Sequence, residues 1–443
     1  MRIISKVMGM YDLMEIKVYL VEQLQKKRAP HRQSAPIYFL SPTLENVNLL
    51  IDDWTPSKRK EPLYADKVFL YFTKAVPDEL FMKIKACKPL IRRLGAFNEI
   101  NIDFVANEDR VFHFDMNSSN VFSQLFQLTA AGHSPMHNAI ADKLVTVCAT
   151  LNEYPHIRYR ESSTVASSIA HLFNTKFNSF VGSNNEWWYH GDSSHSERGR
   201  STLMILSRKD DCLSPLLHEF TYQAMVNDLL ELHDEKITVE VPSENGREVK
   251  DALLNDDDEL WVELRGKHIA EVIKILSARI RDIVHSNSGV ANLNKKEGKA
   301  LSISQMTNAL KNLPEYREVM SKLAQHMYIA HTCMGKFNSN DLMEVSDLEQ
   351  TMANGTNDSG KSVRVSDMVD LVEELLQKID DPQMRFRLVA IFVISQKGLR
   401  STDQGRLFAA ARLNPNEAKA LSNLESLGYP LLQTANNSRS LLG

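Results

Sequence analysis

Long apolar runs are missing from this sequence. A membrane-spanning helix needs roughly 18 consecutive apolar residues, and the longest candidate, Leu388–Ile394, reaches only the length of a buried helical segment. The N-terminal stretch Met1–Glu15 carries charges too early and too often for a secretory signal. We therefore expect a cytoplasmic protein that has neither a transmembrane helix nor a cleaved leader.

Cysteine is scarce, and the four cysteines lie far apart at Cys87, Cys148, Cys212 and Cys333. The absence of a C-x-x-C pair argues against both a zinc site and a disulfide framework, and a reducing compartment is the simplest inference. Two catalytic patterns are missing as well. His218-Glu219 lacks the second histidine of H-E-x-x-H, and no G-x-S-x-G elbow occurs. We expect no metal and no cofactor.

An excess of positive charge is also absent, since 52 Lys and Arg face 56 Asp and Glu, for a net charge of -4. That balance argues against a general nucleic-acid-binding protein. Two local basic patches occur, Lys26-Lys27-Arg28 and Lys58-Arg59-Lys60. Each could contact a partner, but a solvated helix end or loop is the more ordinary interpretation.

What is present is an alternation of strand and helix patterns in a chain of 443 residues, enough for about three domains. Four apolar segments read as strands: 36–40, 67–72, 100–105 and 110–114. Helical spacing appears in Thr43–Asp52 and again after Pro77. This alternation predicts a parallel sheet with helices on both faces.

A second α/β region is predicted from Ser134-Pro135, an N-cap followed by a first-turn proline. The segments that follow are a helix toward Asn152, a helix over Ser163–Phe180 and a strand over Thr202–Leu206. In the polar loop between the last two, Trp187-Trp188-Tyr189 is either a loop anchor or a contact patch, and the sequence does not decide.

After His218 the pattern becomes helical, with one clear strand at Lys236–Val241. Apolar residues at helical spacing predict four helices in the ranges 268–284, 301–334, 368–378 and 386–395. The acidic run Asn255–Glu259 is interpreted as a helix N-terminus, because acidic side chains suit that end of a helix.

One segment, Gly355–Ser362 (GTNDSGKS), fits the phosphate-loop pattern, with Lys361 on the terminal phosphates and Ser362 on magnesium. That motif requires a buried strand before it and a helix directly after it. Asp341–Ala353 is polar and helix-like, and Val363-Arg364-Val365 is not typical of a helix start. The composition favours a polar linker.

Two long segments carry a family resemblance. Leu203–Leu230 (LMILSRKDDCLSPLLHEFTYQAMVNDLL) and Asp257–Val272 (DDELWVELRGKHIAEV) resemble motifs of the SM family, the Sec/Munc syntaxin-binding regulators of SNARE-mediated fusion. Shorter stretches match in order along the chain: Tyr38–Asp53, Pro77–Phe81, Asn98–Phe104, Leu151–Arg160 and Ser304–Tyr316. The resemblance is to the Munc-type branch that acts in exocytosis.

The resemblance implies an α/β plus α fold, an arch of two parallel-sheet α/β domains and a large helical third domain. The implied boundaries are 1–116 for domain one, 117–217 for domain two, 218–345 for helical domain 3a, 346–366 for a linker and 367–443 for helical domain 3b. Relative to the family pattern, the strand before Met1 is missing, and the chain stops near Tyr429-Pro430 before domain two is completed. A divergent paralogue, a truncated isoform and an incomplete gene model are all compatible with this.

In function, the resemblance implies a non-enzymatic monomer that binds syntaxin and the assembling SNARE complex. It would reach the plasma membrane or secretory vesicles through that partner and regulate vesicle docking, exocytosis and protein transport. The positions matching a pocket for the syntaxin N-terminal peptide are Val76, Pro77, Asp78, Phe81, Phe97 and Glu99. Glu22 matches a syntaxin-groove residue, Gly9 replaces a lysine of that groove, and Pro314 falls at the hinge of a domain 3a hairpin.

Three hypotheses follow. The first is an SM-type SNARE regulator that performs no bond chemistry. The second is a nucleotide hydrolase that uses Lys361. The third is a helical scaffold that kept the fold and lost syntaxin binding. Without the resemblance, Phe81 and Phe97 would be read as residues that pack a helix against a sheet.

Overall fold

The structure, a computed structural model, describes residues 2–55, 61–116, 121–126, 134–189, 199–233, 235–243, 246–286, 317–357 and 359–433. Its chain divides into two compact units, Met1–Asp210 and Asp211–Gly443. The first is mixed α/β and the second is mainly helical, which confirms the predicted fold class.

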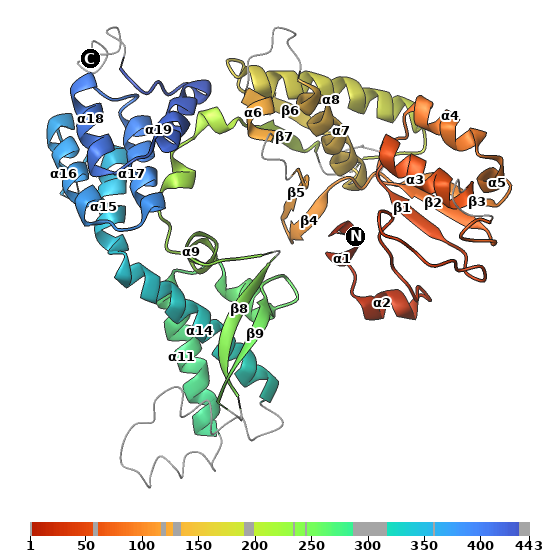
Figure 1. The fold of residues 1–443 in the computed structure, drawn as a ribbon, viewed down its shortest axis with the longest axis horizontal. Helices are drawn as coiled ribbons and strands as arrows, with labels where there is room; N and C mark the ends of the chain where they lie inside the picture. Colours follow the sequence, from red (N-terminus) through yellow and green to blue (C-terminus); the bar gives the residue numbers. More distant parts are fainter. Residues whose placement is uncertain are drawn as a thin grey trace. The chain divides into compact units, whose positions relative to one another are not determined.

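The first unit contains a three-stranded parallel sheet in the order β1-β2-β3 (Figure 1). The predicted strands and helices of this region are confirmed, and β3 is an additional strand that the sequence pattern did not single out. Its elements are α1 (Arg2–Ser5), α2 (Met10–Glu15), β1 (Ile37–Leu40), α3 (Leu44–Trp54), β2 (Val68–Phe72), α4 (Asp78–Ala86), α5 (Lys88–Ile91) and β3 (Leu94–Glu99).

The core of this sheet lies on one face. Val68, Leu70 and Phe72 of β2 are fully buried and share a cluster with residues of α3, α4 and α5, whereas the alternating Phe69 and Tyr71 are partly exposed. The expected arrangement with helices on both faces is therefore wrong for these three helices. Successive right-handed crossovers that advance in one direction place their helices on the same side of the sheet.

The rest of the first unit has two parallel strands, β6 and β7, covered by the packed helix pair α7 and α8. Ser134 caps α7 by accepting a hydrogen bond from the Met136 amide, as predicted. The elements are β4 (Val105–Glu108), β5 (Val111–His113), α6 (Val121–Phe126), α7 (Pro135–Thr150), β6 (His156–Tyr159), α8 (Thr164–Ser183) and β7 (Thr202–Ile205).

The aromatic cluster after α8 is a loop anchor. The Trp187 indole donates a hydrogen bond to the Ala149 carbonyl at 3.3 Å. Its ring packs edge-to-face on Phe177, with centroids 5.5 Å apart, and on Phe180. These contacts hold the chain that leaves α8 against the α7–α8 pair.

Asp103 connects the end of the first sheet to α7. Its carboxylate lies 3.2 Å from Lys143 Nζ and 3.5 Å from Lys74 Nζ, and its amide donates to Thr146 Oγ1. The predicted strand over 100–105 is wrong here. Asn101 has φ 54°, in the left-handed region that ends a strand, so that the chain turns before β4 begins.

Arg28 anchors the irregular segment that precedes β1. Its guanidinium makes two hydrogen bonds, of 2.8 and 2.9 Å, to the carboxylate of Asp53 on α3, and Tyr38 donates to the same carboxylate at 2.7 Å. Burial opposes the charge on Arg28, but the hydrogen bonds and charge of Asp53 outweigh it and raise the pKa of Arg28. The reading of Arg28 as a solvated loop cation is therefore wrong, whereas Lys58, Arg59 and Lys60 lie outside the described residues.

The described residues of the second unit form two hydrophobic clusters, one from a hairpin and four helices and the other from five further helices. The predicted strand at 236–241 pairs with a second strand that the sequence pattern missed. The elements are α9 (Tyr222–Leu229), β8 (Lys236–Ser243), β9 (Gly246–Leu253), α10 (Glu259–Leu264), α11 (Ile269–Ser286), α14 (Arg317–Ser339), α15 (Leu342–Asn354), α16 (Val365–Lys378), α17 (Pro382–Ser395), α18 (Ser401–Ala410) and α19 (Pro415–Ser422). Figure 1 shows the hairpin of β8 and β9 and the helices α15 to α19.

A buried polar network holds the first cluster together. Asp258 caps α10 by accepting from the amides of Leu260 and Trp261, which confirms the predicted helix start. Its Oδ2 also lies 3.2 Å from His326 Nε2 and 3.0 Å from Lys322 Nζ. Burial favours a raised pKa for the Asp258 carboxyl, yet the hydrogen bonds from His326 and Lys322 outweigh it and hold that pKa below its usual range.

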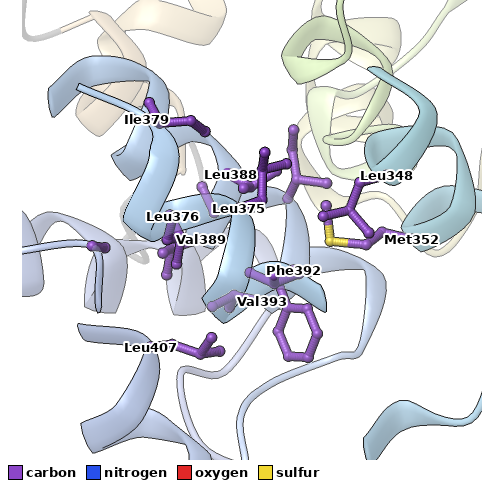
Figure 2. Close-up of a cluster of buried hydrophobic side chains, with 14 of the residues drawn as sticks. Leu348, Met352, Leu375, Leu376, Ile379, Leu388, Val389, Phe392, Val393 and Leu407 are labelled. Carbon is purple, nitrogen blue, oxygen red and sulfur yellow. The ribbon is translucent and has the colours of Figure 1, made fainter. Parts of the chain in front are cut away.

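The second cluster is built from apolar residues at helical spacing on consecutive helices (Figure 2). Leu388, Phe392 and their neighbours on α17 lie at its centre, because α17 is apolar on most sides and buries nearly its whole surface. Around it lie Leu348, Met352, Leu375, Leu376, Ile379 and Leu407. Within the described ranges, no helix combines the length and apolar composition that crossing a membrane requires.

The expected linker at 346–366 is shorter than predicted. Helix α15 continues to Asn354 and buries Leu348 and Met352, so that among the described residues of this range the non-helical ones are 355–357 and 359–364. The interpretation of Val363–Val365 as unlike a helix start is also wrong, since Arg364 is the N-cap of α16. The interpretation of Asp341–Ala353 as helix-like is confirmed by α15, whose buried face makes it part of the helical core and not of a linker.

In the loop after α15, several backbone amides donate hydrogen bonds to acceptors within the same loop. Gly355 ends the helix with φ 72°, a conformation that favours glycine. The amides of Ser359 and Lys361 both donate to Asn357 Oδ1, and the Gly360 amide donates to the Asn357 carbonyl. The element before this loop is a helix, whereas the phosphate-binding motif needs a strand, and these amides are the groups that would have to face a phosphate.

We expect Asp258→Asn to destabilise the second unit by about 1–3 kcal/mol at neutral pH, because a buried charge-assisted network loses its carboxylate. Because the folded-state pKa of Asp258 is depressed, its contribution is present above the unfolded pKa of about 3.9 and is lost as pH falls through the folded value. Urea unfolding followed by circular dichroism at about pH 7 and about pH 2 should show a smaller loss of stability on acidification in the variant than in the wild type.

The matched control is Asp257→Asn, which changes the neighbouring exposed carboxylate. Equal urea midpoints for the two variants at neutral pH would contradict the structural role given to Asp258.

Candidate peptide-binding site on the first unit

The six residues predicted to form a peptide pocket lie at the carboxyl ends of two neighbouring parallel strands. In the pairing of β2 with β3, Leu70 lies opposite Phe97 and Phe72 lies opposite Glu99. The chain leaves β2, passes Val76 and Pro77, and enters α4 at Asp78. Since parallel strands end at the same edge of a sheet, the start of α4 lies beside the end of β3. We call Val76, Pro77, Asp78, Phe81, Phe97 and Glu99 the Phe81–Glu99 surface.

Glu99 is held at this edge by the backbone. The Val76 amide donates a hydrogen bond of 2.8 Å to Glu99 Oε1, which ties the end of β3 to the loop before α4. Glu99 is exposed, and among the described residues no Lys, Arg or His forms an ion pair with it. A fixed carboxylate without a cationic partner is suited to a basic group of a ligand.

Three aromatic rings connect the core to the surface. Phe72 is fully buried, and its ring centroid lies 5.4 Å from that of Phe97. Phe97 in turn packs edge-to-face on Phe81, with centroids 5.6 Å apart and an interplanar angle of 84°. Phe81 remains 42% exposed. Phe97 thus packs helix against sheet, as the alternative reading held, while Phe81 also presents a supported apolar face to solvent.

The first turn of α4 adds negative charge to this surface. Pro77 is the N-cap of α4, and its carbonyl accepts from the amides of Leu80 and Phe81 at 2.9 Å. Asp78 and Glu79 follow in the first turn, where the helix dipole favours carboxylates. The start of α4 and the end of β3 thus carry acidic groups in the same part of the unit as the exposed ring of Phe81, a combination that fits a ligand carrying both an apolar and a basic side chain.

Glu22 lies elsewhere on the unit. It is exposed and its charge acts on Tyr64, which packs against Tyr38 and Trp54 at the other end of α3. The structure therefore does not bring Glu22 together with the Phe81–Glu99 surface. Gly9, where the groove lysine is missing, is the N-cap of α2. Pro314 lies outside the described residues.

Sequence reasoning missed an apolar segment before Glu22. Seven large apolar side chains in the range 7–20 are at least half exposed, and Tyr11 is 85% exposed. We call this set the apolar N-terminal segment; it comprises Val7, Met10, Tyr11, Met14, Ile16, Tyr19 and Leu20. Helical periodicity alone would assign such residues to a core, so that no sequence signal identified their exposure. Contiguous exposed apolar side chains mark interaction surfaces.

The described residues include no group of three or more His, Cys, Asp or Glu side chains that could hold a metal ion. The side chains of the Phe81–Glu99 surface and of the apolar N-terminal segment offer apolar contact, hydrogen bonding and charge pairing.

Comparisons with known proteins identify relatives along the whole chain. The chain is 33% identical over 448 residues to the protein transport protein sec1 of Dictyostelium discoideum, covering 100% of this chain and 71% of that protein. It is 28% identical over 435 residues to the SNARE-interacting protein KEULE of Arabidopsis thaliana, covering 96% of this chain and 63% of KEULE. The chain thus spans less than two thirds of the length of KEULE.

Among solved structures, the Unc18–syntaxin 1 complex from Monosiga brevicollis matches with a TM-score of 0.83 and 25% identity, covering 97% of this chain and 74% of that chain. The sequence profile of the Sec1 family matches residues 1–442. Because that match includes both units, the chain belongs to the Sec1 family of SM proteins.

Proposed function

We propose that this protein binds a syntaxin-type SNARE and regulates vesicle docking and SNARE-mediated membrane fusion, and so takes part in exocytosis and protein transport. One observation carries the proposal: the similarity to Unc18, solved in complex with syntaxin 1, extends over 97% of the chain. The site geometry adds to it, because two separate surfaces of the first unit have the chemistry that binding a peptide and a helix requires.

The Phe81–Glu99 surface takes the N-terminal peptide of the syntaxin. An apolar side chain of the peptide packs on the exposed ring of Phe81, which is supported by Phe97 and the buried Phe72. A basic side chain pairs with Glu99, whose position is fixed by the Val76 amide. A rigid aromatic anchor beside a charge pair is the usual composition of an interface hot spot.

The apolar N-terminal segment takes a helical part of the same partner. An amphipathic helix binds by laying its apolar face on an exposed apolar surface. Tyr11, Met14 and their neighbours offer such a surface, and Glu22 supplies a carboxylate next to it. The ion pair between Arg28 and Asp53 fixes the chain that carries these residues to α3.

The protein acts through non-covalent binding and performs no bond chemistry. The only nucleotide-like motif follows a helix, and the amides of its loop donate to Asn357. We further expect a monomer that reaches the plasma membrane or secretory vesicles through its SNARE partner. The other candidate functions, a nucleotide hydrolase and a scaffold without syntaxin binding, are tested below.

Replacing Phe81 by Ala should weaken binding of a synthetic syntaxin N-terminal peptide about tenfold, because the peptide loses its apolar anchor. Glu99→Lys should weaken binding by at least the same factor, and the effect should shrink at high salt, because it is electrostatic. Isothermal titration of the full chain measures both.

The controls are Phe112→Ala, which removes an equally exposed phenylalanine from β5, and Glu186→Lys, which reverses an exposed charge after α8. Unchanged peptide affinity in Phe81→Ala and Glu99→Lys would exclude the Phe81–Glu99 surface as the peptide site. Absence of binding by the folded wild type, both of the peptide and of a syntaxin cytosolic region, would support the scaffold that has lost syntaxin binding.

The double substitution Tyr11→Ser with Met14→Ser should reduce binding of a complete syntaxin cytosolic region about tenfold or more, since it removes two exposed apolar contacts. Binding of the short N-terminal peptide should not change. Pull-down and titration with the two ligands separate these effects. Leu151→Ser with Met204→Ser removes two exposed apolar residues from other elements of the same unit and serves as the control. Equal losses in both double variants would exclude a specific role for the N-terminal segment.

Titration with ATP and magnesium should release no binding heat in the wild-type protein or in Lys361→Ala, because the loop amides are engaged by Asn357. Heat that appears in the wild type and disappears in Lys361→Ala would establish the nucleotide-binding alternative instead.

A further inference from the structure

One stretch of the first unit departs from the charge balance of the chain. Residues 80–98 (LFMKIKACKPLIRRLGAFN) contain five basic residues and no acidic residue, although the whole chain has a net charge of -4. The five are Lys83, Lys85, Lys88, Arg92 and Arg93. They lie on α4, on α5 and in the turn that leads to β3. The acidic residues of α4, Asp78 and Glu79, lie in its first turn. Positive charge is therefore concentrated from the last turn of α4 through α5 to the turn before β3.

Four of these cations have no acidic partner among the residues that the structure describes. Lys83, Lys85, Lys88 and Arg92 are exposed, and the described residues provide no ion pair to any of them. Lys83 has one hydrogen bond, of 3.3 Å, to the neutral side chain of Asn48. Arg93 differs, because it is held by the carbonyls of Ala65 and Pro89 and lies over the Trp54 ring. Charge without local compensation costs energy through self-repulsion, and an anionic partner relieves that cost.

Two large apolar side chains project among these cations. Met82 is 59% exposed and Ile91 is 38% exposed. The opposite sides of the same two helices supply buried core residues, Ile84 and Leu90. The helix pair is thus anchored inward by apolar residues, and its outer side mixes cations with exposed apolar groups. We call Met82, Lys83, Lys85, Lys88, Ile91 and Arg92 the α4–α5 basic face.

We propose that the α4–α5 basic face docks directly on membranes that contain anionic phospholipids. Basic side chains near an anionic bilayer each strengthen binding about fivefold. Exposed apolar side chains beside them enter the boundary between headgroups and acyl chains. An acidic protein partner would be recognised by the cations alone, whereas Met82 and Ile91 fit an interface that is anionic outside and apolar inside. This membrane contact is additional to recruitment through a SNARE.

The test is co-sedimentation of the full chain with vesicles. Vesicles of phosphatidylcholine containing about 30% phosphatidylserine should bind the protein at low salt and release it as the ionic strength rises. Vesicles of phosphatidylcholine alone should bind little. The variant Lys85→Gln, Lys88→Gln, Arg92→Gln should bind the anionic vesicles about a hundredfold more weakly, which is the product of three fivefold losses. Glutamine is used because it removes charge without placing an acid at the end of a helix.

The matched control is Lys361→Gln, Arg400→Gln, Lys419→Gln, which removes the same charge from exposed positions of the second unit and should bind as the wild type does. Met82→Ser with Ile91→Ser should weaken vesicle binding, and the dependence of binding on salt should stay the same because the charges are unchanged. Equal vesicle binding by the two triple variants, or equal binding to neutral vesicles, would overturn the proposal. So would retention on immobilised polyglutamate with no binding to vesicles, which would point to an acidic protein instead.

The syntaxin N-terminal peptide provides an independent readout. Unchanged peptide affinity in the variant Lys85→Gln, Lys88→Gln, Arg92→Gln shows that the first unit is folded. A loss of vesicle binding in that variant is then caused by the change in the α4–α5 basic face. Failure of peptide binding in the wild type would contradict the proposed function. The vesicle experiment would still test the membrane contact independently.

Discussion

The parallel pairing of β2 with β3 determines the position of every residue at the Phe81–Glu99 surface. Because the two strands run in the same direction and end at the same edge, the loop that leaves β2 passes beside the last residue of β3. The hydrogen bond from Val76 to Glu99 then closes this edge. A shift of the register by one residue would turn Phe97 away from Phe81 and move Glu99 out of reach of the loop. Strand pairing therefore determines where these side chains lie, and the side chains determine what the surface can bind.

Buried polar contacts fix those parts of the chain that regular structure does not hold. Arg28 and Asp53 attach an irregular segment to α3, and Asp258 attaches the start of α10 to α14 through His326. In the second unit, the His218 amide and Nδ1 both contact the buried carboxylate of Glu349 on α15. Each of these acids is nearly inaccessible to water, so removal of its partner leaves a buried carboxylate with fewer hydrogen bonds and less compensating charge. Such contacts specify positions that hydrophobic packing alone would leave undetermined.

The sequence predicted most regular elements correctly and failed where the deciding contact lies far away. Helices α7 and α10 are marked by local caps at Ser134 and Asp258, and local caps can be read from neighbouring residues. Arg28 could not be assigned, because its partner Asp53 is 25 residues distant and two lysines precede it. Strand β9 was missed because it reads GREVKDAL, a polar pattern that becomes a strand through pairing with β8.

The candidate site was predictable only in part. The family resemblance selected Phe81 and Glu99, and the structure brings them together, but spacing alone would not have shown that Phe81 remains exposed while Phe97 is packed. The predicted groove residue Glu22 is separate from them. The exposure of the apolar N-terminal segment depends on what packs over it in three dimensions, and residue types do not contain that information.

Helix α4 contains its own charge separation. Asp78 and Glu79 occupy its first turn, Lys83 and Lys85 occupy its last turn, and this order opposes the helix dipole at both ends. The helix therefore gains stability from the charged residues at both of its ends. A change that converts one end to the sign of the other would weaken the helix itself, so any variant made to test binding at these four positions also alters the stability of α4.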